Sequence, residues 1–434
     1  MRWIKTLASV CLSVVLLSGC GKKEGDRAGT APKEGEIVFW HWWTDRQQIL
    51  DELAAEYKQK TGVSVRFQVA APVGSEYNNK LQAAAQGNTL PDIIGIAAGG
   101  EFLARYINAG KILELTDSMK RDWQDRFFPR TLEDFSYKEG NQYGVKPGTV
   151  WAVPISAMAI QFYYNKDLFK QAGLDPENPP KTWKSFLEAG RKLKENGIIP
   201  MSIGFGDLWM IGAFMEPYAW SYLGKDKMRS TILGRQSYMV SEWEKTLKLF
   251  ADLKDNDILA KGSVTSPNKE SEQLFANGKC AMIMNGSWGM SVFRGMNPNL
   301  NYGVMRLPKA EDAPYPMYVR GGVGSGAAVT LSSKRQSECV DFLRWLTDKE
   351  QMLKYGNKGF DLPANRTCTN ELQPSLKVFS ASLNDLIPDI NLSEKFEVQE
   401  ALWKGVQLIL IGQMNAKQVL EKVMEAKIKS QKGI

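Results

Sequence analysis

The sequence predicts an α/β protein in which strands and helices alternate, and three observations support this prediction. Residues 37–40 form an apolar run of β-branched and aromatic side chains, which is the composition of a strand buried on both faces. Residues 47–60 place apolar side chains at helical spacing, and residues 63–69 alternate between apolar and polar. Such an order favours a mostly parallel sheet that helices cover on both faces.

The alternation continues along the chain. A helix through Leu81 and Ala85 is followed by a third strand over residues 91–96 and a helix over residues 101–109. Later segments repeat the pattern: a strand over 159–164 closed by Asn165 as a turn or cap residue, a helix capped by Thr182, a helix through Leu274 and Phe275, and a strand over 280–284.

The first twenty residues have the features of an export signal. Two basic residues precede a mostly apolar stretch, residues 7–17, which is far shorter than the ~20 residues that a membrane span needs. The stretch ends in Leu-Ser-Gly-Cys, which resembles a bacterial lipobox, so we interpret residues 1–19 as a signal peptide and Cys20 as a lipidated residue. The alternative is a secretory signal whose cysteine is incidental. Residues 20–35 have little apolar content and are expected to be a flexible tether.

Composition limits the chemistry of the protein. The formal net charge is +7, and the basic residues are spread along the chain, so no nucleic-acid-binding surface is expected. His41 is the single histidine, which argues against a Cys/His zinc site and, since no Gly-x-Ser-x-Gly motif accompanies it, against a serine hydrolase. We therefore expect no metal, no cofactor and no catalytic residue.

Four cysteines lie outside the predicted signal peptide. Cys280 lies in an apolar strand pattern and Cys339 on an apolar helical face, so both are expected in the core. With Cys20 lipidated, Cys280, Cys339 and Cys368 allow at most one disulfide, and the sequence leaves open whether one forms.

Aromatic and polar side chains follow the first predicted strand, where ligands bind in open α/β sheets. They are Trp42, Trp43, Thr44 and Asp45. Indole faces stack on the apolar faces of sugars, and carboxylates accept hydrogen bonds from sugar hydroxyls. Trp40, inside the strand, is interpreted as a core residue, and one of the two following tryptophans is expected to be a core residue as well.

A series of different short motifs runs along nearly the whole chain that follows the predicted signal peptide. They are Val-Phe-Trp at 38–40, Lys-Thr-Gly-Val at 60–63, Leu-Pro-Asp-Ile-Ile at 90–94, Tyr-Asn-Lys-Asp-Leu-Phe at 164–169, Pro-Lys-Thr-Trp at 180–183, Gly-Lys-Cys-Ala-Met at 278–282, Asn-Gly-Ser-Trp at 285–288 and Gly-Phe-Asp-Leu-Pro at 359–363. Together they resemble the family 1 extracellular solute-binding proteins, to which the maltose-binding protein belongs. The resemblance implies a monomeric, non-enzymatic receptor that delivers a carbohydrate, in particular an oligosaccharide, to an ABC import permease. Such a receptor would be anchored to a membrane by its lipid and face the periplasm or the cell exterior.

The resemblance also implies two lobes joined by crossing strands, with the ligand in the cleft between them. The crossings are expected near residues 151–154, 320–322 and 363–366. The first lobe would then comprise residues 36–152 plus 322–362, and the second lobe residues 153–320 plus 364–434.

The ligand site follows from matching the family's contact motifs. Residues after the first strand, the Glu-Pro-Tyr segment, the Asn-Gly-x-Trp turn and the expected crossings supply the candidates, with aromatic neighbours added. The candidate ligand-binding residues are Trp43, Thr44, Asp45, Glu101, Trp209, Glu216, Tyr218, Trp288, Gly322 and Arg366. The glycine-rich run 321–326 lacks the Gly-Lys-Ser/Thr of a phosphate loop, so its glycines are attributed to a strand crossing or to close approach of a ligand.

The chain departs from the family pattern after the third strand, where residues 97–101, Ala-Ala-Gly-Gly-Glu, replace aromatic and charged residues. This departure argues against maltose and leaves a neutral oligosaccharide as the favoured ligand. Arg320 and Arg366 would suit an acidic sugar or a phosphate instead. A glycoside hydrolase is the competing function, because Asp45, Glu101 and Glu216 are candidates for an acid-base pair.

Overall fold

The computed structural model describes residues 35–71, 74–97, 99–120, 122–141, 143–388 and 394–432. The described residues belong to one compact unit that begins at Gly35. The predicted signal peptide and nearly all of the tether lie outside the described residues. Within these ranges, no helix combines the length and the apolar character needed to cross a bilayer.

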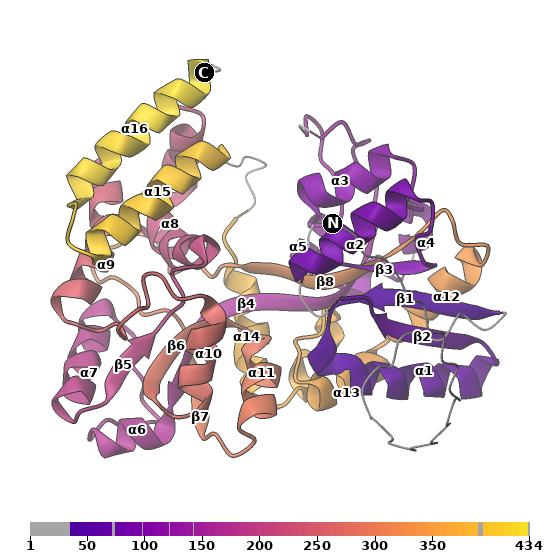
Figure 1. Cartoon of the computed structure of the whole chain (residues 1–434), viewed down its shortest axis with the longest axis horizontal. Coiled ribbons are helices and arrows are strands. Elements are labelled where there is room, and N and C mark those ends of the chain that lie inside the picture. Colours follow the sequence, from indigo (N-terminus) through magenta and orange to yellow (C-terminus); the bar gives the residue numbers. More distant parts are fainter. Residues whose placement is uncertain are drawn as a thin grey trace, which may run out of the picture. The chain divides into compact units, whose positions relative to one another are not determined.

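The sheet follows the predicted alternation of strands and helices (Figure 1). Its strands are β1 (Glu36–His41), β2 (Ser64–Val69), β3 (Ile93–Ile96), β4 (Val153–Asn165), β5 (Ile199–Ser202), β6 (Cys280–Gly286), β7 (Tyr302–Met305) and β8 (Gly321–Val329). The order across the sheet is β2-β1-β3-β8-β4-β6-β5, with β7 paired to β4. β1 is parallel to both neighbours and β5 is parallel to β6, as predicted. The pairs that involve β4 or β8 are antiparallel, so the sheet is mixed.

Helices separate the strands and cover the sheet. The first group is α1 (Gln47–Thr61), α2 (Gly74–Gln86), α3 (Gly100–Asn108), α4 (Thr116–Met119), α5 (Pro129–Glu133), α6 (Lys166–Gln171), α7 (Trp183–Glu195) and α8 (Leu208–Ile232). The second group is α9 (Ser241–Asp255), α10 (Asn268–Ala276), α11 (Gly289–Met296), α12 (Gln336–Leu346), α13 (Lys349–Gly359), α14 (Pro374–Ser382), α15 (Phe396–Leu410) and α16 (Ala416–Lys432). The described residues also form the 3-10 turns η1 (Thr44–Arg46), η2 (Gln124–Arg126), η3 (Arg366–Glu371) and η4 (Leu383–Asp385).

β4 is shared by the two halves of the sheet. Up to Ala159 it pairs with β8, and from Ile160 onward it pairs with β6 and then β7. Ser156 has Ser325 of β8 as one neighbour, with 2.7 Å between the two Oγ atoms, and Pro363 as another. Chain segments from all three expected crossings therefore lie side by side, while the division into two lobes at these points stays a prediction.

Alternate side chains of β4 enter different cores. Phe162 packs with side chains of α7 and α8, and Tyr164 packs with Phe169 of α6. Tyr163 packs on the opposite face with Phe275 and Phe293. Successive side chains of a strand point to opposite faces, so a continuously apolar strand such as this one is expected where both faces are covered.

The predicted caps are confirmed. The Thr182 side chain accepts from the Ser185 N–H, and the Ser185 hydroxyl accepts in return from the Thr182 N–H, which forms a capping box at the start of α7. The Asn165 side chain accepts hydrogen bonds from the N–H groups of Asp167 and Leu168 and so caps α6. These side chains satisfy N–H groups that the first turn of each helix leaves unpaired.

The three cysteines among the described residues are free and buried: Cys280, Cys339 and Cys368. Burial raises the pKa of each thiol to about 12. The prediction that Cys280 and Cys339 are core residues is confirmed, and the structure contains no disulfide among these three.

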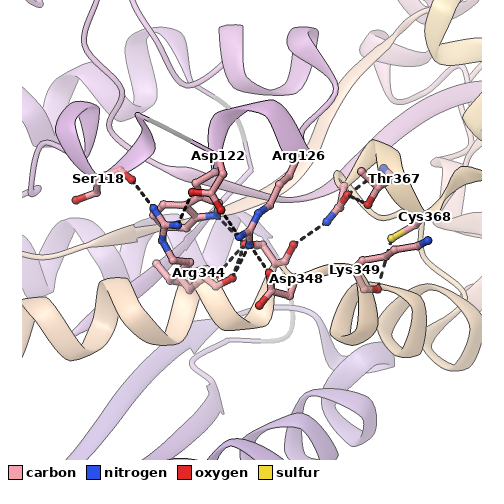
Figure 2. Close-up of polar contacts among 12 residues, drawn as sticks. Ser118, Asp122, Arg126, Arg344, Asp348, Lys349, Thr367 and Cys368 are labelled. Atoms are coloured by element: carbon pink, nitrogen blue, oxygen red, sulfur yellow. Dashed lines mark hydrogen bonds and ion pairs between the residues drawn. The ribbon is translucent and has the colours of Figure 1, made fainter.

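A network of charged side chains joins the segment around η2 to α12 and α13 (Figure 2). The Arg344 guanidinium contacts Asp122 at 2.9 Å, and the Arg126 guanidinium contacts both Asp122 at 2.9 Å and Asp348. Arg344 also lies 5.0 Å from the ring of the buried Trp123. Exposed ion pairs contribute only about 0–1 kcal/mol each, but this network fixes the chain next to the third expected crossing.

Candidate functional site

A cavity of about 390 Å³ lies beside the shared strand β4. Its wall combines the chain around β4 and β8 with one face of α8 and with α15. The residues that matter below are Met158, Met215, Glu216, Trp220, Arg320 and Trp403. A largely apolar wall with a few polar groups is typical of sites for small molecules.

An ion pair between Glu216 and Arg320 lies on this wall. Glu216 comes from the middle of α8, and the Arg320 backbone is fixed by its carbonyl, which accepts from the Ile160 N–H at 2.9 Å. The two side chains are 34% and 36% exposed, so both remain accessible. Because each charge has an opposite partner, the pair offers hydrogen-bond donors and acceptors with little net charge.

Aromatic side chains form much of the remaining wall. Tyr238 and Trp243 pack with their rings 4.9 Å apart, and Trp220 lies edge-on to Tyr318. Trp403 of α15 packs on α8 at Gly212, where a Cβ would lie 3.0 Å from the indole nitrogen. Aromatic rings combine a large apolar contact area with little conformational entropy to lose on binding.

A second carboxylate of the wall, Glu394, is compensated by its neighbours. Lys427 Nζ lies 2.7 Å from both carboxylate oxygens, and the Tyr238 hydroxyl donates to Glu394 at 2.7 Å. Burial is the main cause that raises the pKa of Tyr238. Glu394 therefore acts as a fixed part of the wall.

Two tryptophans form a pair at the start of α8 and the end of β6. Trp209 is 40% exposed, Trp288 is partly buried, and their ring centroids lie 6.1 Å apart. The Trp288 ring lies against Gly286, where a Cβ would collide with it. The glycine of the Asn-Gly-Ser-Trp motif is therefore needed for the orientation of this indole.

The residues after β1 contact α11, which follows Trp288. Ser291 Oγ donates to Asp45 Oδ2 at 2.5 Å, and the Ser291 hydroxyl also lies 2.8 Å from the Trp288 carbonyl oxygen. Arg46 pairs with Asp45 at 3.2 Å and with Asp361 at 2.9 Å. Burial acts to raise the pKa of Asp45, but Arg46 and Ser291 outweigh it and lower this pKa. The Asp45 carboxylate thus joins η1 to α11.

Comparison with known proteins decides the family. Residues 42–353 match the model of the bacterial extracellular solute-binding proteins. The chain belongs to this family. Its fold agrees with solved structures of two-lobed binding proteins. The Thermus thermophilus maltotriose binding protein has a TM-score of 0.69, 20% identity and coverage of 90% of this chain and 99% of that one. A chitin oligosaccharide binding protein has a TM-score of 0.69 at 21% identity, over 91% and 98% of the two chains.

Similar sequences belong to transport proteins. The sn-glycerol-3-phosphate-binding periplasmic protein UgpB of Brucella melitensis is 24% identical over 404 residues, which is 90% of this chain and 88% of the relative. UgpB of Escherichia coli is 29% identical over 225 residues, 51% of this chain and 50% of the relative. Like these relatives, this solute-binding protein is a binding protein and not an enzyme.

Two residues that the family resemblance assigned to the ligand lie in the core of this solute-binding protein. Trp43 is 3% exposed and packs on Phe39 and His41, because residues 39, 41 and 43 share one face of the extended chain. Tyr218 has no exposed surface, since two residues along α8 from Glu216 the helix has turned its side chain toward the core. Neither side chain has surface to offer to a ligand. Trp42, on the other face, is partly exposed beside Tyr77.

Three other candidates are not among the residues that line this cavity. Glu101 is exposed on α3, 3.6 Å from Arg105. Arg366 lines a different hollow of about 510 Å³, and its Nε donates to the Asp125 carbonyl at 2.8 Å. A Cβ at Gly322 would collide with the Asp134 carboxylate, so this glycine serves the packing of β8.

The structure therefore brings together only part of the predicted set. Glu216 lies on the cavity wall, Trp209 pairs with Trp288, and Asp45, with the exposed Thr44 beside it, meets α11 next to Trp288. Asp45 contacts Ser291, Glu216 pairs with Arg320 and Glu101 lies beside Arg105 on α3, so each of these carboxylates takes part in a different polar contact.

Sequence reasoning missed the contribution of α15, the helix that precedes the last helix of the chain. Gln399, Leu402 and Trp403 line the cavity at the i, i+3, i+4 spacing of one helical face. This periodicity is visible in the sequence, but no motif links it to β4 or α8. Tyr238 and Trp243 were missed for the same reason.

Proposed function

We propose that this solute-binding protein captures a carbohydrate, in particular an oligosaccharide, and passes it to the permease of an ABC importer. The observation that carries the proposal is the cavity wall, which combines the Glu216–Arg320 pair with aromatic side chains. The pair offers groups for sugar hydroxyls, and the rings offer stacking surfaces for sugar faces. The Trp209–Trp288 pair, in which Trp209 is exposed and Trp288 partly buried, offers a second aromatic surface.

A neutral ligand agrees best with the charges of the wall. Arg320 is paired with Glu216, Arg130 with Asp134 at 3.2 Å, and Glu394 with Lys427. A phosphorylated polyol is the second candidate, because two guanidinium groups, Arg130 and Arg320, line the cavity and relatives are named for glycerol-3-phosphate. Both candidates keep the same receptor function.

We also propose that the protein works outside the cytoplasm, attached to a membrane through a lipid on Cys20. The support is the sequence motif that ends at Cys20, together with the extracellular family. A Cys20→Ser variant is expected to leave the membrane fraction and to lose metabolic labelling by palmitate. Retention of both would contradict the anchor.

The ligand is tested by titrating the purified protein with maltotriose, chitotriose, xylotriose and glycerol-3-phosphate. Tryptophan fluorescence and calorimetry report binding, and chromatography reports any shortened sugar. We expect saturable binding of one neutral oligosaccharide class without hydrolysis. Binding of glycerol-3-phosphate alone would favour the second candidate, and release of shorter sugars would contradict a receptor.

A further inference from the structure

A buried polar cluster lies behind the Trp209–Trp288 pair. It consists of Asn268 and Glu272 of α10 and Asn285 of β6, which are 7%, 6% and 0% exposed. The Glu272 carboxylate is its centre, because Oε1 accepts from Asn285 Nδ2 at 2.9 Å and from Asn268 Nδ2 at 3.2 Å. The hydrogen-bond partners of this carboxylate are thus amides rather than a cation, and the positive charge of the exposed Lys269 acts on it in addition.

The cluster is connected to both indoles. On one side, Asn285 precedes the turn that carries Trp288, and its Oδ1 accepts from the Gly286 N–H at 3.0 Å. The Trp288 side chain is also one of the neighbours that act to lower the pKa of Glu272. On the other side, the Asn268 N–H donates to Asp207 at 2.8 Å. Asp207 directly precedes α8, whose second residue is Trp209.

Burying a carboxylate without a cation is costly. Transfer of a charged group from water to the protein interior has a penalty of several kcal/mol unless hydrogen bonds compensate it. Burial indeed raises the pKa of Glu272, against the opposing effects of Asn285 and other neighbours. A neutral side chain of similar size would avoid this penalty, so the carboxylate needs a reason that packing alone does not give.

We propose that Glu272 is a positioning residue for the ligand, which holds Trp288 through Asn285 and the turn at Gly286, and Trp209 through Asn268 and Asp207, so that the two indoles form a preformed stacking surface. The assignment of the indoles as ligand contacts rests on the proposed function. Their fixed orientation does not, since it follows from the contacts of the cluster. A surface that is ordered before binding loses less entropy when the ligand arrives.

The first test needs no ligand. In the protein labelled with ¹⁵N-tryptophan, the indole N–H resonances of Trp209 and Trp288 are assigned with Trp209→Phe and Trp288→Phe variants. Glu272→Gln keeps an acceptor for the asparagines but removes the negative charge at the centre of the cluster. We expect the Trp288 resonance to shift, the Trp209 resonance to move with it, and exchange of the Trp288 N–H with D₂O to become faster, because the cluster holds the indole less firmly.

Controls separate positioning from general damage. Glu270→Gln changes an exposed glutamate of the same helix and is expected to leave both resonances unchanged. If Glu272→Gln does not fold, Glu272→Asp keeps the charge but withdraws it from the asparagines, and the same shifts are expected. Unchanged position and exchange of the Trp288 resonance in a folded Glu272 variant would overturn the proposal.

The second test uses whichever sugar of the panel binds. Glu272→Gln is expected to weaken binding about tenfold in the wild-type background and clearly less in the Trp288→Ala background, where only Trp209 is left to be positioned. An equal loss in both backgrounds would overturn a role through Trp288. If no sugar binds, the proposed function fails, while the resonance test still decides whether Glu272 orients the indoles.

Discussion

The ends of β1 and β6 carry the two polar clusters next to the candidate ligand contacts, and the clusters are built differently. After β1, the Arg46 guanidinium lies between the carboxylates of Asp45 and Asp361. After β6, Glu272 is surrounded by neutral donors such as Asn285. The first cluster is held by opposite charges and fixes the backbone of η1. The second places a charge among neutral groups, which suits the orientation of side chains.

The largest effect is expected when the charged cluster is broken. Arg46 is 10% exposed and Asp361 3%, so Arg46→Met would leave a buried carboxylate without its cation. Breaking such a pair costs about 3–5 kcal/mol of the free energy of unfolding, which urea denaturation measures. Arg306→Met, which breaks an ion pair that is about half exposed, is the control and should cost at most about 1 kcal/mol. Similar losses in both variants would contradict the comparison.

The next effect is the pH dependence of His41 at the end of β1. Burial lowers the pKa of His41 from 6.5 to about 4, so in the folded protein the imidazole stays neutral while the unfolded chain takes up a proton. Stability is therefore lost as pH falls from 6.5 to 4, by about 3 kcal/mol in total. His41→Asn should remove this part of the acid dependence in urea unfolding measured at several pH values. Parallel pH profiles of the two proteins would contradict the assignment.

A smaller effect, on binding rather than stability, is expected at the β6 end. Trp288→Ala removes a stacking surface and should weaken binding of the panel sugar about tenfold, or ~1.4 kcal/mol. Trp43→Ala, by contrast, removes a core indole and should lower the free energy of unfolding by about 3–5 kcal/mol. Calorimetry and thermal unfolding of the two variants separate these outcomes. If either variant lost sugar affinity and unfolding free energy to the same extent, the assignment of Trp288 to the ligand surface and of Trp43 to the core would be contradicted.

The smallest effect is expected at Ser291, which joins the charged cluster after β1 to α11. Ser291→Ala removes the donor to Asp45 and should cost about 1 kcal/mol of unfolding free energy. The lowered pKa of Asp45 should rise toward its ordinary value, which a carboxyl NMR titration measures. Because a lowered carboxyl pKa stabilises the fold above that pKa, the variant should also lose less stability on acidification. An unchanged Asp45 titration would contradict the contact.

Much of the fold was predictable because local patterns determine it. The apolar period of α1 and the capping side chains of Thr182 and Asn165 depend on near neighbours in the chain. The direction of the side chains that follow β1 was harder to predict. In a strand buried on both faces, the sequence does not show whether Trp42 or Trp43 faces the core.

The site was predictable only where a motif marks it. Glu216 and Trp288 lie in such motifs, and both take part in the candidate site. Trp403 approaches the cavity from a helix almost two hundred residues further along the chain than Glu216, and only the fold brings the two together. Arg366 lies near a crossing in sequence, but its side chain donates to the Asp125 carbonyl, which belongs to a segment far away in the chain.

The shared strand β4 has a consequence for how this molecule can be divided. Its first half completes the sheet with β8, and its second half completes the sheet with β6 and β7. A gene fragment that encodes either half alone would release a long apolar edge with unpaired N–H and C=O groups, which is a template for aggregation. The two halves therefore have to be inherited together. Recombination between relatives is expected to succeed when it exchanges surface helices rather than whole halves.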